Sequence, residues 1–207
     1  LDKIDLEIKF EDIVILESER SKAIKNSSLG LKDNLTKVNA IIKYKDKKIK
    51  GRIRLKGDRI IHFAKKNHSS YNIYLPKDKF IKGVNNFSIQ KPGVRNYIHE
   101  WIFIEMMDDL GLIKPKYEFF NLYINGTNNG LYVLEEKMSK EIIERNKRRN
   151  GPILSILGEF ERPFENKIFQ VYNEKFWTRP ENIEIAQIAK KKISDFLKGK
   201  RKIEDTF

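Results

Sequence analysis

A predicted β-hairpin near the middle of the chain constrains the fold more than any other stretch. Residues 117–124 and 131–134 are rich in aromatic and aliphatic side chains, a composition typical of strands. Between them lie Asn125 with Gly126 and Asn129 with Gly130. Such pairs favour the positive φ angles of tight turns. The sequence therefore predicts two paired antiparallel strands over this stretch.

Two adjacent carboxylates, Glu135 and Glu136, end the second strand of this hairpin. Neighbours on a strand point to opposite faces, so only one of the two can face a given pocket. This excludes a paired-carboxylate site of the glycosidase kind but leaves a role in holding Mg²⁺ or a lysine near phosphates. A structural role near the helix predicted from Ser139 is the alternative, because negative charge is favourable at a helix start.

The first half of the chain is predicted to be mainly β. Alternating apolar and polar residues predict strands, of which residues 4–16 form the first one or two. A short helix is expected over 18–26. The further predicted strands cover residues 38–44, 49–55, 70–75 and 87–90.

Two helices are predicted from helical spacing of apolar residues, at 98–110 and 181–198. The first is so apolar that we expect it to be a central core helix. The expected fold class is α+β, an antiparallel sheet with packed helices. We expect one domain over 1–207, mainly β over 1–94 and mixed α/β over 95–207.

The composition excludes several kinds of site. Without cysteine the chain has no disulfide or thiolate metal site, and it lacks the P-loop, GxGxxG, GxSxG and HExxH motifs. No apolar run approaches the roughly 20 residues that span a bilayer, so no transmembrane segment is expected. The net charge of +13 invites a nucleic-acid partner, but lysine greatly outnumbers arginine, and readers of nucleic acid favour arginine.

Arg52, Arg54 and Lys56 fall on one face of the strand predicted at 49–55, and Gly57 with Asp58 follows. Three cations in a row could hold phosphates. An edge strand with one solvated basic face is the structural alternative, and the residues alone favour it.

Taken in order, these and neighbouring stretches resemble the CotH kinase family, the spore-coat-protein-H-like atypical protein kinases. The resemblance runs from about Leu6 to the end of the chain. Its strongest parts are RIRLKGD (52–58), FSIQKPGVRNYIHEW (87–101), DLG (109–111), INGTNNGLYVLEE (124–136) and KEIIERNKRRNGPI (140–153).

The resemblance implies a remote protein-kinase-like fold, with an N-lobe and the start of a second lobe. It implies binding of ATP with Mg²⁺ and transfer of the γ-phosphoryl group to Ser or Thr of a protein substrate, such as a Ser-rich one. On this basis Arg54 and Lys56 line the nucleotide cleft, Gly57 allows close backbone approach, and Lys66 or its neighbour Lys65 stands in for a family lysine. Glu136 resembles the family's hairpin-end glutamate, which pairs with a cation or metal. The catalytic aspartate is expected beyond residue 207.

Two departures keep other functions open. His68 and Asn72 stand where the family usually carries Lys and Arg, and the family's catalytic and metal-binding aspartates are expected beyond residue 207. Together these departures motivate a non-catalytic surface or scaffold module as the alternative. A basic nucleic-acid-binding domain is a third possibility, motivated by charge alone. The compartment stays open between the bacterial cytoplasm and the cell envelope or spore surface.

Overall fold

The computed structural model describes residues 1–29, 35–57, 59–65, 68–157, 168–202 and 204. Within these, the chain divides into two compact units, Leu1–Lys137 and Met138–Phe207. Each unit has its own hydrophobic core and is described by itself. Whether the two make a single domain stays a prediction.

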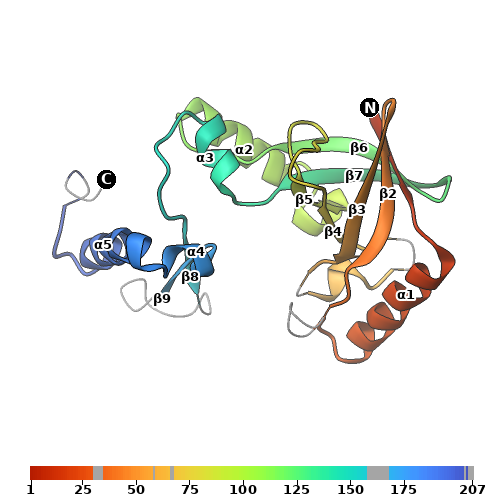
Figure 1. Ribbon diagram of the computed structural model, residues 1–207, viewed down its shortest axis with the longest axis horizontal. Helices are drawn as coiled ribbons and strands as arrows, with labels where there is room; N and C mark the ends of the chain where they lie inside the picture. The colour runs from red at the N-terminus through yellow and green to blue at the C-terminus, as the bar shows by residue number, and fades with distance from the viewer. Residues whose placement is uncertain (30–34, 58, 66–67, 158–167, 203, 205–207) are drawn as a thin grey trace. The chain divides into compact units, whose positions relative to one another are not determined.

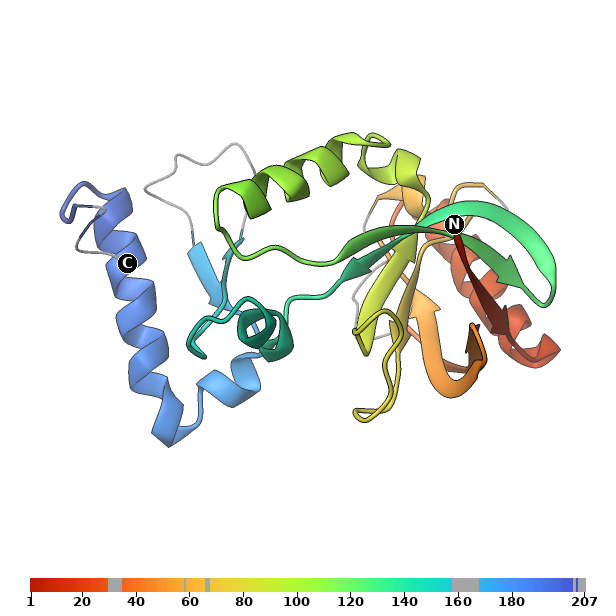
Figure 2. The same ribbon diagram turned by 90° about the horizontal axis from the view of Figure 1, so that it is seen from above.

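The first unit is built around a closed barrel of seven strands among its described residues (Figures 1 and 2). Neighbouring strands are antiparallel except β1 and β6, whose parallel pairing closes the barrel. Around the barrel the strands follow the order β1 (Asp2–Glu7), β2 (Val38–Tyr44), β3 (Lys47–Leu55), β4 (Tyr71–Tyr74), β5 (Asn86–Gln90), β7 (Thr127–Glu136) and β6 (Tyr117–Ile124).

Alternation along each strand decides what fills the barrel and what faces outward. On β3, Ile53 and Leu55 are fully buried in the interior cluster, whereas Arg54 between them points outward. On β7, Leu134 faces the same interior and Glu135 faces outward. The expected α+β class is confirmed at this level, but the sheet is closed rather than open and contains one parallel pair.

The predicted central hairpin is confirmed as β6 and β7, joined at Asn125 and Gly126. Both residues have positive φ, 48° and 79°, as a two-residue turn of this kind requires. The Asn125 side chain also accepts a hydrogen bond from the Ile8 amide (2.8 Å) and donates one to the Ile8 carbonyl (2.9 Å). It thereby fastens the turn to the end of β1, where the barrel closes.

The prediction for residues 4–16 is correct only at its start. After β1 the chain forms helix α1, Phe10–Lys25, which is far longer than the helix expected over 18–26. Its buried residues are Leu16, Arg20 and Ala23, which follow a helical period. The middle member is an arginine, so the stripe was not recognisable as apolar in the sequence.

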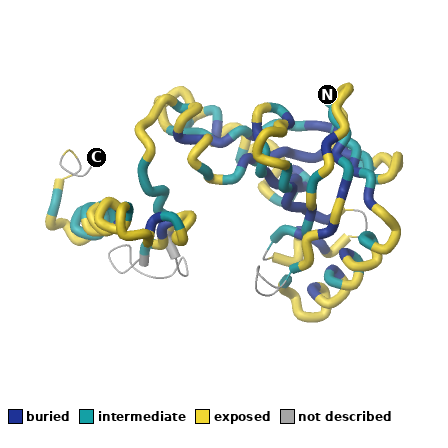
Figure 3. The backbone as a smooth tube through the Cα atoms, viewed as in Figure 1, coloured by how far each residue is buried: buried dark blue, intermediate teal, exposed yellow. Residues whose placement is uncertain are grey.

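Helix α2 (His99–Asp109) confirms the helix predicted at 98–110 but not its central position. Ile104 is its one buried residue and packs with Tyr117 and Val133 on the outside of the barrel. Phe103 and Met106 are 59% and 54% exposed, and Figure 3 shows α2 mostly in the exposed and intermediate colours. A helix against the outer face of a closed barrel buries one side only, because the core lies within the strands.

The second unit has a small core of its own, formed by Val171, Trp177 and Ala186. Its α5 confirms the helix predicted at 181–198. Among the described residues, no helix combines the length and apolarity that crossing a bilayer requires. The elements of this unit are α3 (Lys140–Arg145), β8 (Leu154–Leu157), β9 (Ile168–Val171), α4 (Glu174–Trp177) and α5 (Pro180–Leu197).

Candidate functional site

A row of polar side chains crosses the outer face of the barrel from β3 to β7. The strand registers place Arg54 opposite Asn72, Asn72 opposite Ser88 and Ser88 opposite Glu135. Lys56 lies two residues beyond Arg54, on the same face of the chain. The closed sheet thus gathers residues from three of the stretches that carry the family resemblance.

Lys56 is the centre of this polar face. Its ammonium group donates hydrogen bonds to Ser88 Oγ (2.8 Å), Gln90 Oε1 (3.0 Å) and Glu135 Oε2 (2.6 Å). A lysine ammonium has three hydrogens, so these contacts occupy its full donor capacity. The lysine is therefore held in one position rather than left to sample solvent.

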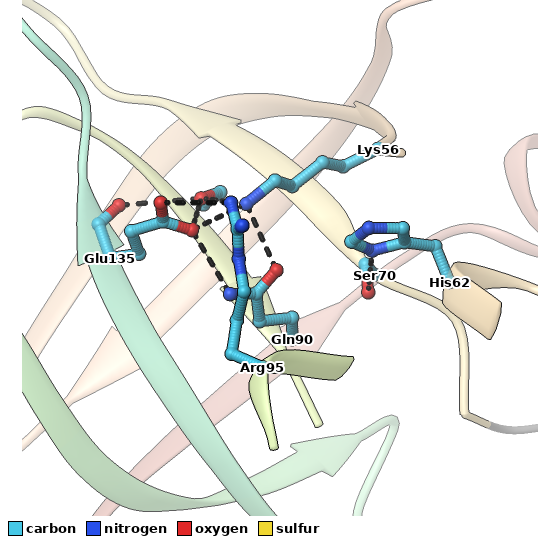
Figure 4. Close-up of polar contacts among 7 residues, drawn as sticks. Lys56, His62, Ser70, Gln90, Arg95 and Glu135 are labelled. Atoms are coloured by element: carbon cyan, nitrogen blue, oxygen red, sulfur yellow. Dashed lines mark hydrogen bonds and ion pairs between the residues drawn. The ribbon is translucent and has the colours of Figure 1, made fainter. Parts of the chain in front are cut away.

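Glu135 is held as firmly as its partner. Gln90 Nε2 donates to Glu135 Oε2 at 3.0 Å, and the Ser88 hydroxyl lies 3.3 Å from the same oxygen. Arg95, from the 3-10 turn η3 (Pro92–Arg95), approaches the other carboxylate oxygen at 3.6 Å. Figure 4 shows Lys56, Gln90 and Arg95 converging on this carboxylate.

The ion pair is largely shielded from water, which shifts the pKa of both partners. Burial lowers the pKa of Lys56, although the charge of Glu135 acts in the opposite direction. Burial alone would raise the pKa of Glu135, but the charge and hydrogen bond of Lys56 outweigh it, so the pKa of this carboxyl is lowered. The 2.6 Å contact between Lys56 and Glu135 is a charge-assisted hydrogen bond, in which each charge stabilises the other.

Gly57 is required by a close approach within the protein. Its φ is +114°, and an ideal Cβ there would lie 2.1 Å from Cγ of His62. His62 belongs to the 3-10 turn η2 (Ile60–His62), and its Nδ1 lies 3.0 Å from Ser70 Oγ. The imidazole ring of His62 thus occupies the position that a side chain at residue 57 would take, while a nucleotide contact at the Gly57 backbone stays a prediction.

Glu136 is not brought together with Lys56. Its Oε2 accepts a hydrogen bond from the Lys116 backbone amide at 2.9 Å, and the residue is 6% exposed. The carboxylate on the outer face beside Lys56 is Glu135. Alternation along β7 was the signal that could have assigned it, since Leu134 had to face the core.

The described residues contain no ready-made cluster of metal-ligating side chains. No three His, Asp or Glu side chains of that part of the chain cluster closely enough to hold a metal ion. Glu136 is committed to the Lys116 amide, and Glu135 to Lys56. Mg²⁺ binding at Glu136 therefore remains a prediction without a supporting ligand set among these residues.

The remaining predicted site residues have separate outcomes. Arg54 lies on the same face as Lys56, and its Nε donates to the Tyr74 hydroxyl at 2.8 Å. Lys137 reaches the same hydroxyl at 3.3 Å. Neither Tyr74 nor Lys137 was predicted, nor were the side chains of residues 88, 90 and 95. Lys66 lies outside the described residues.

A known protein family matches the part of the chain that carries this polar face. The family model described as CotH kinase protein matches residues 53–202. The chain belongs to the CotH family. The match starts within β3 and ends after α5, so it includes Lys56 and Glu135 and extends over both compact units. The CotH resemblance seen in the sequence is thereby confirmed.

A curated CotH relative is also similar to this chain. Inner spore coat protein H of Bacillus subtilis (strain 168) is 24% identical over 158 residues, which cover 70% of this chain and 42% of the relative. The chain thus spans less than half the length of that relative.

Proposed function

We propose that this chain is the nucleotide-binding part of a CotH-family protein kinase, and that Lys56 takes a phosphate oxygen of ATP. The observation that carries the proposal is the 2.6 Å pair between Lys56 and Glu135, set on a buried polar sheet face. In protein kinases a strand lysine that contacts the nucleotide phosphates is held by a glutamate, and both must be in place for transfer. Here the glutamate comes from β7 of the same sheet, with β4 and β5 between it and β3.

When ATP binds, Lys56 would replace a hydrogen bond to the protein, rather than one to water, with a hydrogen bond to the nucleotide. The ammonium group would give one of its three hydrogen bonds to a phosphate oxygen and keep the others, to Ser88 and Gln90. Because the lysine is already oriented, little side-chain entropy is lost on binding. Arg95, which is partly exposed beside Glu135, would add a second cation to the same phosphates.

The finer parts of this function rest on family membership. The proposal also includes transfer of the γ-phosphoryl group to Ser or Thr of a protein substrate, the use of Mg²⁺ and a catalytic aspartate beyond residue 207. Among this chain's own residues, Lys56 and Arg95 form the cationic face that would orient the phosphates.

The binding step is tested by calorimetric titration of the protein with ATP, with and without Mg²⁺. We expect Lys56→Met to weaken ATP binding at least tenfold, because a charge-assisted hydrogen bond to phosphate contributes about 1.5–3 kcal/mol. Lys48→Met is the matched control, because Lys48 is an exposed residue of the same strand. Equal affinities of the two variants, or no binding by the unaltered protein, would refute the proposal.

A second function, a non-catalytic scaffold module, is favoured by one observation. The protein already satisfies all three hydrogens of the Lys56 ammonium, so the pair stabilises the sheet without any ligand. The same titration separates the two functions. If the chain is a scaffold, Lys56→Met should lower its thermal stability, and the unaltered protein should not bind ATP. The full-length protein should then transfer no phosphate from labelled ATP.

A further inference from the structure

A second cationic feature lies at the other end of the exposed face of β3. A hollow of about 280 Å³ opens beside this strand, and its lining includes Lys50, Arg52 and Tyr74. Arg52 and Tyr74 are direct partners in the β3–β4 register. Adjacent strands therefore form most of the hollow, and Leu75 and Pro76, which directly follow β4, complete its lining.

The described lining of the hollow carries positive charge only. Lys50 and Arg52 are both exposed, and neither makes an ion pair with a described residue. Asn39, Leu75 and Pro76 supply neutral walls. Among the lining residues that the structure describes, no carboxylate neutralises the two cations, so the hollow should attract anions.

Tyr74 brings further cations to the same place. Its hydroxyl oxygen accepts hydrogen bonds from Arg54 Nε and Lys137 Nζ, at 2.8 and 3.3 Å. The ammonium groups of Lys37 and Lys137 lie 4.7 and 4.3 Å from the centre of its ring. Tyr74, a wall of the hollow, therefore holds two cationic donors at its hydroxyl oxygen and has a further ammonium group near its ring.

The protonation behaviour of this cluster agrees with an anion-stabilising environment. Burial would raise the pKa of Tyr74, but the hydrogen bond from Arg54 and the charge of Lys137 outweigh it and lower the pKa. Burial lowers the pKa of Lys137, and the charges of Arg54 and Lys56 also act to lower it. An anion bound here would offset this repulsion between like charges.

We propose that the hollow beside Arg52 and Tyr74 binds a phosphate group. Phosphate suits it better than a single carboxylate, because a dianion with several acceptor oxygens can pair with more than one of these cations. Arg52 and Lys56 are four residues apart on one strand, about 13 Å. The site is thus separate from the nucleotide contact proposed at Lys56 and does not depend on it.

The test begins with inorganic pyrophosphate as the probe. Backbone amide NMR shifts of β3 and β4 follow its titration into the protein, and thermal unfolding confirms that each variant is folded. We expect saturable shifts around Arg52 and Tyr74, with affinity at least fivefold weaker in Arg52→Gln. Lys48→Gln removes the same charge from an exposed position of the same strand that does not line the hollow, so its affinity should stay within twofold.

Binding that does not saturate, or that weakens equally in Arg52→Gln and Lys48→Gln, would show general attraction to a basic surface and overturn the proposal. Such a failure is distinct from failure at Lys56, because Lys56→Met should leave pyrophosphate affinity at the hollow within about twofold.

Two further ligands identify the source of the phosphate. If it is carried by a protein, a phosphoserine peptide should bind the unaltered protein and lose at least fivefold in Arg52→Gln, whereas its unphosphorylated form should not bind. If it belongs to a nucleotide, Arg52→Gln should weaken the binding of ATP by a similar factor. The phosphoserine peptide should then show no measurable affinity for the unaltered protein. A hollow at which neither ligand responds to Arg52→Gln would contradict the proposal.

Discussion

Lys56, which directly follows β3, and Glu135 on β7 form a 2.6 Å ion pair although β4 and β5 lie between β3 and β7. Three strand spacings separate β3 from β7, about 14 Å, so both side chains must lean across the sheet. Ser88 and Gln90, on β5, line the path and bond to both partners. The pair therefore depends on the correct pairing of four strands, β3, β4, β5 and β7.

Acid should weaken this pair in a defined pH range. The folded-state pKa of Glu135 lies below the ordinary value of 4.5, so the stability that the pair contributes is present above that pH. It is lost as the pH falls through the folded-state pKa. In urea unfolding between pH 7 and pH 3, we expect Glu135→Gln to be about 1–3 kcal/mol less stable than the unaltered protein at pH 7.

That difference in the free energy of unfolding should shrink as the pH falls through the folded-state pKa of Glu135, because the carboxyl then loses its charge. A constant difference across the range would mean that Glu135 contributes through packing and not through its charge.

Gly57 should tolerate alanine poorly. Alanine there combines a positive φ with a Cβ 2.1 Å from the His62 ring. Gly126→Ala is a matched control, since Gly126 has φ +79° but no atom within 4 Å of the place that a Cβ would take. We expect Gly126→Ala to cost about 1 kcal/mol and Gly57→Ala about 3 kcal/mol or more in chemical unfolding. A double variant, Gly57→Ala with His62→Ala, should recover part of this loss; equal costs for the two glycines would contradict the prediction.

Arg20 should be necessary for joining α1 to the turn after β3. Its Nε and one terminal nitrogen donate to the carbonyls of Phe63 and Ala64, each at 2.8 Å, while the residue is 8% exposed. We expect Arg20→Ala to lower the free energy of unfolding by about 2–4 kcal/mol, because two carbonyl groups lose their donors. Arg20→Lys should lie between, since lysine cannot reproduce the fork. Lys22→Ala, exposed on the same helix, should change stability by less than about 0.5 kcal/mol.

Alkali should destabilise the protein through its buried tyrosines. Burial raises the pKa of Tyr71 to about 12 and that of Tyr117 to about 12, against an ordinary value of 10. Their contribution to stability is complete below pH 10 and is lost as the pH rises toward 12. Absorbance at 295 nm with urea unfolding at each pH should show this decline. Tyr71→Phe should decline less steeply between pH 10 and 12, whereas the exposed Tyr97→Phe should follow the unaltered protein.

Much of the β structure could be predicted because its signals are local. Alternation located β2, β3, β4 and β5, and the Asn125 and Gly126 pair located the turn between β6 and β7. Helix α1 was missed in part because its buried face includes Arg20, whose partners are carbonyl groups over 40 residues away. The exposure of α2 was not predicted, because an apolar composition indicates that a helix packs against another surface but does not indicate which surface.

The sequence by itself determined most strands of the barrel, the hairpin turn, the cationic face of β3 and membership of the CotH family, because these depend on neighbours in the chain and on ordered motifs. Only the tertiary structure decided that the sheet closes through a parallel β1–β6 pair, that Gly57 makes room for His62, and that Glu135 lies beside Lys56. Each of these is a contact between strands or turns distant in the chain. Strand register and barrel closure set such contacts, and neither is written in any one segment.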